Sequence, residues 1–506
     1  MTTLPTHLNI ADYFLDARIR EGKGDRTALR TTAGDYSYGD VQQLSNRFGN
    51  MIRQAGCEPE QRVIIALPDG PEYVAALFGT LKIGGVVVMV NPHLRSDQLT
   101  AMFEYTRATI VITHVSTRET FAAASRDARF IKQTIVTGED AFAADLVRMS
   151  DELETFPSHR DDPAIWLFSG GTSGQPKAVV QTHRSYVNTT ECYGANVIGY
   201  TEEDITIAVP KLFFGYAMGS NLFFPFAVGG SAVLFTERCT PAVLFDMVER
   251  FRPTIFVNVP TMVGQMIAEP DAAERDFSSL RIATSAGEAL PSELHERWNA
   301  TFGVELLDGL GTAEMWHIFL SNRPGDVRPG TLGQAVPGFE VKVCDDEGRE
   351  LPHGEVGYLW VRGDSRAIAY WQLMDETRRA FRGEWYVSED MLSRDRDGYF
   401  TYAGRADDML KVSGKWLSPQ EIENCLLQHE AVLECAVVGV AVDGLTRPYA
   451  FVVPRAEVPE GFPGILQSFI KDRLEKYKCP REVFILDALP RTHLGKVDRG
   501  RLRVHY

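Results

Sequence analysis

Short runs of β-branched residues alternate with amphipathic stretches of helical length from about residue 60 onward. Residues 62–67 have the composition of a strand, residues 71–83 the periodicity of a helix, and residues 86–91 the composition of a strand again. Strands that alternate with helices imply parallel sheets covered on both faces. A second series follows, with strands at 232–235, 254–259, 280–284 and 304–307 and helices at 240–251, 261–268 and 291–302. The sequence therefore predicts an α/β fold whose large N-terminal domain contains two similar α/β lobes.

The pattern changes near residue 330. Residues 338–344 and 355–361 alternate like antiparallel strands around a turn at 345–348, which predicts a small β-barrel-like subdomain. After residue 404 a charged segment precedes a separate α+β pattern, with helices at 419–428 and 465–476 and strands at 434–440 and 450–453. A domain of about 100 residues lies within the usual range. We therefore predict an N-terminal domain at 1–405 and a C-terminal domain at 406–506.

The composition limits the partners. A chain of 506 residues exceeds one ordinary core, and its formal net charge of -16 disfavours general affinity for nucleic acid or an anionic membrane. The seven cysteines form no CxxC pair, which favours reduced thiols in the cytoplasm over a disulfide framework or a zinc site. The first residues lack the pattern of a signal peptide, and the longest apolar run, 86–90, is too short to cross a bilayer. We expect a cytoplasmic protein without nucleic-acid or membrane partners, and the sequence leaves the oligomeric state open, a homodimer included.

Residues 166–177 form the most informative segment, in which an apolar strand leads into small and hydroxylated residues that end at Lys177. Glycine lets a backbone approach a phosphate closely, hydroxyl and amide groups donate hydrogen bonds, and a lysine adds charge. A flexible linker is the alternative interpretation, but the apolar residues 178–180 on the far side disfavour it. The loop lacks the Walker A spacing, as does the segment around 495–496, and residues 309–314 lack the third glycine of a dinucleotide fingerprint.

This loop resembles the phosphate-binding signature of the adenylate-forming superfamily, which includes acyl- and aryl-CoA ligases, luciferases of the firefly type and peptide-synthetase adenylation domains. Five further segments resemble signatures of that superfamily in the same order, at 285–290, 310–314, 385–390, 404–423 and 490–499. The resemblance covers nearly the whole chain. It implies a large AMP-binding domain followed by a small, mobile C-terminal domain that carries a catalytic lysine.

The resemblance assigns roles to individual residues. Lys496 would bridge the substrate carboxylate and the α-phosphate, Glu314 would hold Mg²⁺, and Asp407 would be the hinge between two domain orientations. The thiolation-side residues would be Lys411, Ser413, Gly414, Lys415 and Trp416. The residues that would contact ATP or AMP are Ser169, Gly170, Gly171, Thr172, Ser173, Gly174, Lys177, Ala286, Gly287, Glu288, Asp308, Gly309, Leu310, Gly311, Thr312, Asp390 and Arg405.

These residue types suit a reaction in which two anions meet. A carboxylate attacks the α-phosphorus of ATP and displaces pyrophosphate, so the site must neutralise charge in the transition state. Mg²⁺ prefers oxygen ligands, which a glutamate supplies. A thiol then displaces AMP from the acyl-adenylate. Taken singly, Glu314, Asp390 and Lys496 would be solvated surface charges, and only the motif context favours the catalytic interpretation.

The chain departs from the superfamily pattern at five positions. Leu310 stands where Tyr is usual, Ala313 where Thr is usual, Gly170 where Ser is usual, and both Ala178 and Glu389 where Gly is usual. Ala313 removes a hydroxyl that is normally aimed at the nucleotide phosphate. These differences bear on catalytic efficiency more than on the type of reaction.

Two segments, 211–219 and 314–325, resemble the corresponding stretches of benzoate-CoA ligases. Phe213 and Phe223 are equally well explained as core aromatics, as is Phe214, and His317 also suits a structural histidine. By the resemblance, the aryl pocket would contain Phe214, Gly215, Tyr216, Gly311, His317 and Ile318. We therefore predict an AMP-forming aryl-CoA ligase that uses benzoate or a substituted benzoate, ATP with Mg²⁺, and coenzyme A, without a prosthetic group.

Coenzyme A as the acceptor rests on these segments and on a chain that stops at Tyr506 without a carrier domain. Two alternatives remain at this stage. One is an aryl-acid adenylating enzyme that loads a separate carrier protein, which release of free aryl-CoA would exclude. The other is a ligand-binding homologue that has lost catalysis, which pyrophosphate release with ATP and benzoate would exclude.

Overall fold

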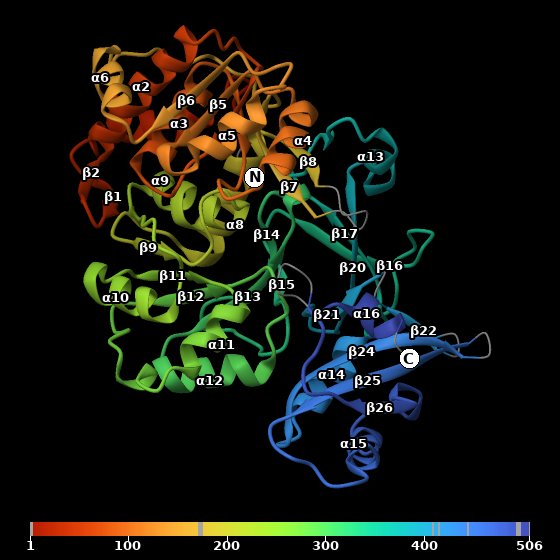
Figure 1. The fold of residues 1–506 in the computed structure, drawn as a ribbon. Helices are drawn as coiled ribbons and strands as arrows, with labels where there is room; N and C mark the ends of the chain where they lie inside the picture. Colours follow the sequence, from red (N-terminus) through yellow and green to blue (C-terminus); the bar gives the residue numbers. More distant parts are fainter. Residues whose placement is uncertain are drawn as a thin grey trace. The chain divides into compact units, whose positions relative to one another are not determined.

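The computed structural model describes residues 4–170, 176–406, 409–412, 415–442, 445–491 and 497–504. The chain divides into two compact units (Figure 1). The larger unit comprises the residues up to Glu340 together with Val361–Tyr386, and the smaller unit comprises Val341–Trp360 together with the residues from Val387 onward. The domain boundary that we place between residues 405 and 406 stays a prediction, because compactness groups some residues before it with the C-terminal part of the chain.

A seven-stranded sheet forms the first lobe of the larger unit (Figure 1). Its order is β18–β8–β7–β4–β3–β5–β6, made by β3 (Arg62–Ala66), β4 (Val86–Met89), β5 (Ile110–His114), β6 (Gln133–Thr137), β7 (Pro163–Ser169), β8 (Lys177–Thr182) and β18 (Ala369–Tyr370). Every residue of β4 is buried, as is typical of a parallel strand covered on both faces. The helices of this lobe are α2 (Tyr38–Gln54), α3 (Pro71–Lys82), α4 (Ser96–Thr106), α5 (Arg118–Ser125), with η2 (Val115–Thr117) before it, and α6 (Asp140–Arg148).

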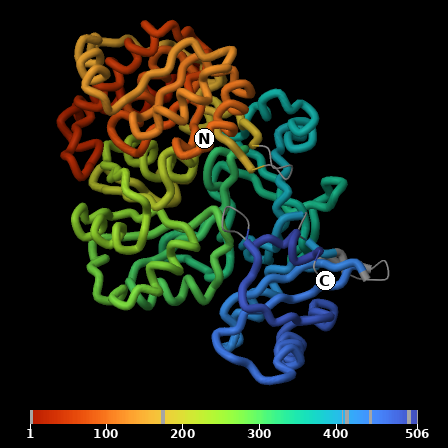
Figure 2. The backbone as a smooth tube through the Cα atoms, in the orientation of Figure 1, coloured from red at the N-terminus to blue at the C-terminus, as the bar shows by residue number. Residues whose placement is uncertain are grey.

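A nine-stranded sheet forms the second lobe. Its order is β15–β14–β13–β12–β11–β9–β10–β1–β2, made by β1 (Thr27–Thr31), β2 (Gly34–Ser37), β9 (Ile205–Ala208), β10 (Ser231–Val233), β11 (Ile255–Asn258), β12 (Ile282–Ser285), β13 (Leu306–Gly311), β14 (Ile318–Ser321) and β15 (Gln334–Ala335). Helices α10 (Pro241–Phe251), α11 (Pro260–Ala268) and α12 (Ser292–Phe302), with η5 (Ala272–Glu274), pack on it. Their apolar side chains share one buried cluster with the strands, in which Val248, Phe256 and Trp298 are fully buried. In Figure 2 the early, red and orange part of the chain gathers mainly in the first lobe and the green part in the second.

Short helices lie before β1, between β8 and β9, between β9 and β10, and between β13 and β14. They are η1 (Asp12–Asp16), α1 (Ala17–Arg20), α7 (His183–Thr189), η3 (Thr190–Ile198), α8 (Gly215–Met218), η4 (Gly219–Phe223), α9 (Phe224–Val228) and η6 (Ala313–Met315). Phe14, Phe78 and Phe223 form ring contacts between the N-terminal segment, the first lobe and the segment after β9. This aromatic layer fixes the segment that contains α8 against both lobes.

The sheets are mixed rather than wholly parallel, which corrects the expectation from the alternating pattern. The central strands are parallel, with Val63 paired to Val87 and Ile255 paired to Ile282. Antiparallel pairs occur at three sheet edges, where β8 pairs with β7 and β18, β1 pairs with β2, and β14 pairs with β13 and β15. The β5–β6 edge is parallel. A hairpin needs only a few residues, whereas a parallel crossover needs a dozen or more.

Capping residues and prolines mark the first residues of several helices. Ser37 accepts a hydrogen bond from the Asp40 N–H while the Asp40 carboxylate accepts one from the Ser37 N–H, which is a capping box at α2. Thr240 caps α10, and a proline occupies the first helical position, Pro241. The predicted helices at 71–83, 240–251, 261–268 and 291–302 are confirmed within one or two residues at each end.

A five-stranded sheet follows the second lobe in sequence, with order β16–β17–β20–β19 and β21 paired to β20. Its strands are β16 (Glu340–Cys344), β17 (Gly357–Arg362), β19 (Phe381–Arg382), β20 (Trp385–Arg394) and β21 (Phe400–Arg405), and α13 (Met374–Ala380) lies between β18 and β19 in sequence. The predicted turn at 345–348 is present, closed by a hydrogen bond of 3.0 Å from the Gly348 N–H to the Asp345 carbonyl. The residues of this sheet are divided between the two units.

The C-terminal part of the smaller unit has the predicted α+β pattern. Strands β22 (Leu410–Val412) and β23 (Lys415–Leu417) form a two-stranded sheet, and β24 (Val432–Val442), β25 (Leu445–Pro454) and β26 (Glu482–Ile485) form a three-stranded sheet. The helices are α14 (Pro419–Leu427), α15 (Phe462–Lys471), η7 (Lys476–Lys478) and α16 (Arg499–Val504). Ile422, Val437 and Leu466 belong to its buried core. In the part of the chain that the structure describes, no helix is both long enough and apolar enough to cross a membrane.

Candidate active site

Buried polar atoms without protein partners gather along β13 and the residues that follow it. Within the described ranges, Asp308 Oδ1, Thr312 Oγ1 and His317 Nδ1 are buried and have no hydrogen-bond partner. Burial raises the pKa of the Asp308 carboxyl well above its usual range, although Ser285 on the neighbouring strand lowers it in part. Buried polar atoms are nearly always hydrogen-bonded in proteins, so this group indicates a place where a ligand or water supplies the missing partners.

The predicted phosphate loop is the connection of a β-hairpin. Ser169 at the end of β7 pairs with Lys177 at the start of β8, so the two strands hold both ends of the loop together. The Lys177 ammonium lies 5.2 Å from the ring centroid of Tyr370 on β18. Gly171, Thr172, Ser173 and Gly174 lie outside the described residues. The hairpin therefore fixes where the loop begins and ends.

Glu314, the predicted metal ligand, is buried on the short helix η6. Its Oε1 accepts a hydrogen bond of 2.8 Å from the Tyr370 hydroxyl, and its backbone carbonyl accepts one of 2.8 Å from the Ala367 N–H. One residue earlier, the Ala313 carbonyl accepts a hydrogen bond of 2.7 Å from Gln181 on β8. Tyr370 on β18 thus holds the Glu314 carboxylate, and Gln181 on β8 holds the backbone beside it.

The Glu314 carboxylate is an oxygen ligand of the kind that Mg²⁺ takes. Among the described residues, no group of three or more histidine, cysteine, aspartate or glutamate side chains is arranged to hold a metal ion. Mg²⁺ keeps several waters and is often bound by one or two carboxylates together with substrate phosphates. The hydrogen bond from Tyr370 occupies only Oε1 of Glu314, so Oε2 remains for such an ion.

A γ-turn at Trp316 separates Glu314 from His317. Trp316 has φ 64° and ψ -48°, and the His317 N–H donates a hydrogen bond of 2.9 Å to the Met315 carbonyl. This left-handed turn is rare and strained for a residue with a side chain, at a cost of about 1–3 kcal/mol. Trp316 is 2% exposed and packs against Tyr186, with 4.3 Å between the ring centroids. Packing therefore holds a strained turn that brings the metal-ligand candidate and the aryl-pocket candidate onto one short stretch.

The structure brings together most of the residues predicted for the aryl pocket. Tyr216 on α8 donates or accepts a hydrogen bond of 2.7 Å with Thr284 on β12, and its ring centroid lies 5.5 Å from that of His317. Gly311 pairs with Ile318 across β13 and β14. A methyl group on Gly311 would lie 2.5 Å from the His317 carbonyl oxygen, so only glycine allows this approach of the two strands. That these residues bind an aryl acid stays a prediction.

His317 is neutral and oriented by its Nε2. That nitrogen lies 3.0 Å from the Tyr216 carbonyl and 3.2 Å from the Ser220 hydroxyl. Because a carbonyl oxygen only accepts, Nε2 carries the hydrogen and Nδ1 presents a lone pair. Burial lowers the pKa of His317 to about 3. The imidazole therefore adds a polar but uncharged surface among aromatic rings, with Phe224 at 4.8 Å between centroids.

Three further candidates of the larger unit are Phe214, Gly287 and Glu288. Phe214 is 53% exposed and its ring lies against that of Phe213, whereas Phe223 is a core residue. Gly287 has φ 89°, a left-handed conformation that favours glycine. The Glu288 carboxylate accepts hydrogen bonds from the N–H and hydroxyl of Thr261, so it holds the first turn of α11.

The predicted ribose-binding pair lies in the smaller unit. Asp390 on β20 pairs in register with Arg405 on β21, and their charged groups are 3.6 Å apart. Ser388 donates a hydrogen bond of 2.6 Å to Asp390, and Glu389 forms an ion pair with Arg405. The departure from glycine at position 389 therefore adds a second carboxylate that holds Arg405.

Several predicted residues lie outside the described part of the chain. They are Asp407, Ser413, Gly414 and Lys496, in addition to the four loop residues. The backbones of Lys411 and Trp416 pair across β22 and β23, as do those of Val412 and Lys415. An antiparallel bridge joins Arg491 to Val497, the described residues on either side of Lys496.

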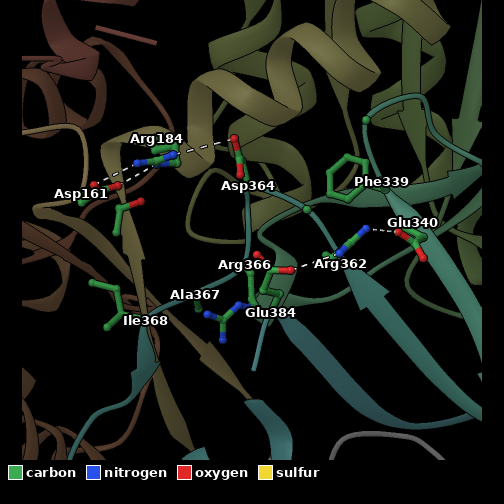
Figure 3. A pocket seen from close by; sticks show the side chains of 13 residues that line it. Asp161, Arg184, Phe339, Glu340, Arg362, Asp364, Arg366, Ala367, Ile368 and Glu384 are labelled. Carbon is green, nitrogen blue, oxygen red and sulfur yellow. Dashed lines mark hydrogen bonds and ion pairs between the residues drawn. The ribbon is translucent and has the colours of Figure 1, made fainter. Parts of the chain in front are cut away.

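A pocket of about 850 Å³ lies elsewhere in the larger unit, and none of the predicted site residues lines it (Figure 3). Arg184 pairs with Asp161 at 2.7 Å and Arg362 pairs with Glu384 at 3.1 Å, while Arg366 faces the ring of Phe381 at 5.5 Å. Its lining contains three arginines and four acidic residues. The absence of a net positive charge in this lining gives no support for binding ATP phosphates there.

The sequence did not single out Tyr370, Gln181, Thr284 or Ser388, although each contacts a candidate residue. Nothing local marks Tyr370, Gln181 or Thr284, because each lies on a strand whose partner comes from a distant segment, whereas Ser388 lies only two positions from Asp390. Tyr370 is 56 positions from Glu314, and Gln181 is 132 positions from Ala313. A hydroxyl beside a buried carboxylate is a signal only once the sheet order is known.

Residues 15–371 match the model of the AMP-binding enzyme family. The chain belongs to this family. Residues 421–496 also match the AMP-binding enzyme C-terminal domain. The adenylate-forming resemblance is therefore confirmed over both the large and the small part of the chain.

Solved and characterised relatives resemble this AMP-binding enzyme over nearly its whole length. A benzoate--CoA ligase of Thauera aromatica is 39% identical over 508 residues, covering 99% of this chain and 96% of the relative. A crystal structure of an anthranilate CoA ligase with anthranoyl-AMP superposes with a TM-score of 0.91 at 36% identity, covering 99% of this chain and 97% of the other. A crystal structure of a benzoate CoA ligase from Burkholderia xenovorans LB400 superposes with a TM-score of 0.88 at 38% identity, covering 98% of this chain and 99% of the other. The predicted α/β fold, with a large N-terminal and a small C-terminal part, is confirmed by these two structures.

Proposed function

We propose that this chain is an AMP-forming aryl-CoA ligase. It converts benzoate, or a small substituted benzoate, and ATP into aryl-AMP and pyrophosphate, and then transfers the aryl group to coenzyme A with release of AMP. The AMP-binding family and the benzoate--CoA and anthranilate CoA ligase relatives support the class of reaction. The observation that carries the substrate class is the joining of Glu314 and His317 through one γ-turn.

That turn places the proposed Mg²⁺ ligand close to the proposed aryl pocket. Glu314 provides a buried carboxylate for Mg²⁺, which supplies charge neutralisation at the phosphates when it is bound. Three positions later, His317 contributes to a surface of aromatic and aliphatic groups with Tyr216 and Ile318. An aryl ring seated on that surface directs its carboxylate back toward the metal side of the turn. A carboxylate oxygen and the α-phosphate are thereby held for in-line attack.

The pocket favours an uncharged ring over a second carboxylate. His317 stays neutral at physiological pH because burial lowers its pKa to about 3. Tyr216 also stays neutral, since burial raises the pKa of its hydroxyl well above the usual value. A second carboxylate would lose its hydration without a compensating cation, which is strongly unfavourable. We therefore expect benzoate and small substituted benzoates to be used and dicarboxylic acids to be rejected.

For the nucleotide we propose the residues assigned by resemblance. Lys177 and the loop after Ser169 hold the β- and γ-phosphates, Asp390 with Arg405 holds the ribose, and Lys496 neutralises charge during adenylation. Ala313 lacks the hydroxyl that is usual at its position, but the preceding residue, Thr312, has one. The buried Thr312 Oγ1 has no hydrogen-bond partner among the described residues. This hydroxyl remains free to donate to a phosphate oxygen, which favours an active enzyme over a ligand-binding homologue.

We also propose that the enzyme is cytoplasmic, because reduced cysteines and access to ATP and coenzyme A suit that compartment. We further propose a homodimer, which light scattering would test. Rotation of a C-terminal domain at 406–506 about Asp407, with Lys411, Ser413, Gly414, Lys415 and Trp416 on the thiolation side, completes the proposal.

The experiment supplies purified protein with ATP, Mg²⁺ and a panel of acids, and measures pyrophosphate release and then aryl-CoA by mass spectrometry. We expect pyrophosphate release with benzoate and aryl-CoA formation when coenzyme A is added. Pyrophosphate release without any aryl-CoA would favour the alternative of loading a carrier protein. No pyrophosphate release with any aryl acid would contradict the proposed function.

A further inference from the structure

A buried carboxylate outside the predicted site contacts the segment that carries the aryl-pocket residues. Asp69 lies in the turn between β3 and α3 and is 7% exposed. Both of its oxygens accept from the backbone N–H of Leu212, at 3.0 and 3.3 Å. Leu212 lies 143 positions later, after β9 of the second lobe. This contact joins the carboxyl end of a strand in one lobe to the carboxyl end of a strand in the other.

Residues 211–216, which we term the aryl segment, run from this contact to Tyr216. At its start, Lys211 donates a hydrogen bond of 2.8 Å to the Phe235 carbonyl, and the Phe214 N–H donates one of 2.9 Å to the Lys211 carbonyl. At its end, the Tyr216 hydroxyl meets Thr284 at 2.7 Å, and the Tyr216 carbonyl accepts from His317. The aryl segment is therefore held at both ends, and Asp69 is the only side chain from the first lobe that bonds to its backbone among the hydrogen bonds of the described residues.

The Asp69 carboxylate is costly for the fold. Among the described residues Asp69 forms no ion pair, and the Lys211 ammonium donates its hydrogen bond to the Phe235 carbonyl instead. Burial raises the pKa of Asp69 to about 6, and Lys211 and the Leu212 N–H lower it only in part. Tyr73 and Cys239 are the other titratable groups that face it. An unpaired buried carboxylate with a shifted pKa at a strand end is typical of a functional site rather than of a core.

We infer that Asp69 is a positioning residue for the aryl-acid site, which fixes the start of the aryl segment so that Tyr216 meets His317 at the correct distance. This inference rests on the proposed function. Asp69 acts through the Leu212 backbone and does not touch the reacting atoms. Loss of its acceptor leaves a buried N–H unsatisfied and lets residues 212–216 shift, whereas the nucleotide candidates on β7, β8 and β13 keep their own contacts.

The test compares Asp69→Ala with Asp69→Asn, whose amide oxygen still accepts from the Leu212 N–H. We expect Asp69→Ala to raise the KM for the best aryl acid by about 10-fold or more, on the scale of losing a hydrogen bond to a charged group, and to leave the KM for ATP unchanged. Asp69→Asn should restore a KM for the acid close to that of the wild type. Should Asp69→Ala fail to fold, Asp69→Ser replaces it, because a serine hydroxyl is too short to reach Leu212.

Asp204→Asn is the matched control. Asp204 is also a buried acid beside β9, but it lies before the strand and pairs with Arg281 at 2.8 Å. We expect it to lower the thermal midpoint without separating the two KM values. Equal changes in both KM values for Asp69→Ala, or no change in either, would overturn the inference while the wild type stays active. A wild type that uses no aryl acid would overturn this inference together with the proposed function.

Discussion

Replacing Gly219 by alanine should perturb the predicted aryl pocket by displacing His317. A methyl group at position 219 would lie 2.4 Å from His317 Cδ2, 2.6 Å from His317 Nε2 and 3.1 Å from Phe224 Cζ. These atoms belong to buried rings, so the imidazole must move and give up its bonds to Tyr216 and Ser220. Overpacking costs about 1–3 kcal/mol, and loss of the one Nε2 hydrogen that these two acceptors share adds about 1 kcal/mol. We expect the free energy of unfolding to fall by about 2–4 kcal/mol.

The displaced imidazole should change the kinetic constants for the aryl acid and leave those for ATP unchanged. A change of pocket shape by one methyl group alters selectivity by about 1–3 kcal/mol, so kcat/KM for benzoate should fall about 10- to 100-fold. The KM for ATP should stay unchanged. The assay measures pyrophosphate release over a range of each substrate, together with chemical denaturation to confirm the change in stability.

Gly215→Ala is the matched variant on the same segment. Its methyl group would lie 3.4 Å from Leu167 Cδ1 and from the Trp316 carbonyl oxygen, which is ordinary contact, so stability should be unchanged or rise by up to about 1 kcal/mol. We expect it to lower kcat/KM for 2-substituted benzoates more than for benzoate, by about 10-fold, because it fills room beside the ring. An unchanged ratio would show that Gly215 does not shape the ring site. A Gly219→Ala enzyme with normal benzoate kinetics would refute the assignment of His317 to the pocket.

Four further predictions concern other parts of the chain. Lys496→Ala should slow adenylation by about 100-fold or more while thiolation of supplied aryl-AMP survives, and equal loss in both half-reactions would contradict its assigned role. Asp407→Pro, which fixes φ near -65°, should separate pyrophosphate exchange from aryl-CoA formation, and retention of both rates would place the hinge elsewhere. Because burial raises the Asp69 pKa from 3.8 to about 6, the folded state binds a proton more readily than the unfolded state does. The ionised Asp69 should therefore lower the free energy of unfolding by about 3 kcal/mol above pH 6, and by progressively less as the pH falls from 6 to 4. In denaturation experiments, the gain in stability from Asp69→Asn should be smaller at pH 5 than at pH 7.5. Lys82→Ala leaves Asp16 buried without the ammonium now 2.6 Å away and should cost about 3–5 kcal/mol in urea unfolding, while a loss below about 1 kcal/mol would show that solvent reaches the carboxylate.

The sequence by itself determined the local elements and the chemistry of the loops. The apolar runs at 62–67 and 86–91 became β3 and β4, and the periodic stretch at 71–83 became α3, because burial on one or two faces imposes a period that local residues record. The small and hydroxylated residues up to Lys177 predict a phosphate loop, because glycine and hydroxyl groups suit phosphate binding whatever the rest of the fold, and this role stays a prediction. The motifs also named Glu314, Tyr216 and His317 before any contact was known.

Only the tertiary structure decided which of these residues meet. The Tyr216 carbonyl and the His317 imidazole are 101 positions apart, and the Leu212 N–H and Asp69 are 143 positions apart. Their contacts follow from the order of strands, in which β9 lies between β10 and β11 and the chain crosses from one lobe to the other before α8. Hydrophobic periodicity reports whether a face is buried but not what buries it, so neither the antiparallel sheet edges nor the role of Asp69 could be predicted from local pattern. The strained turn at Trp316 has the same origin, because only packing against Tyr186 compensates for a backbone conformation that the residue itself disfavours.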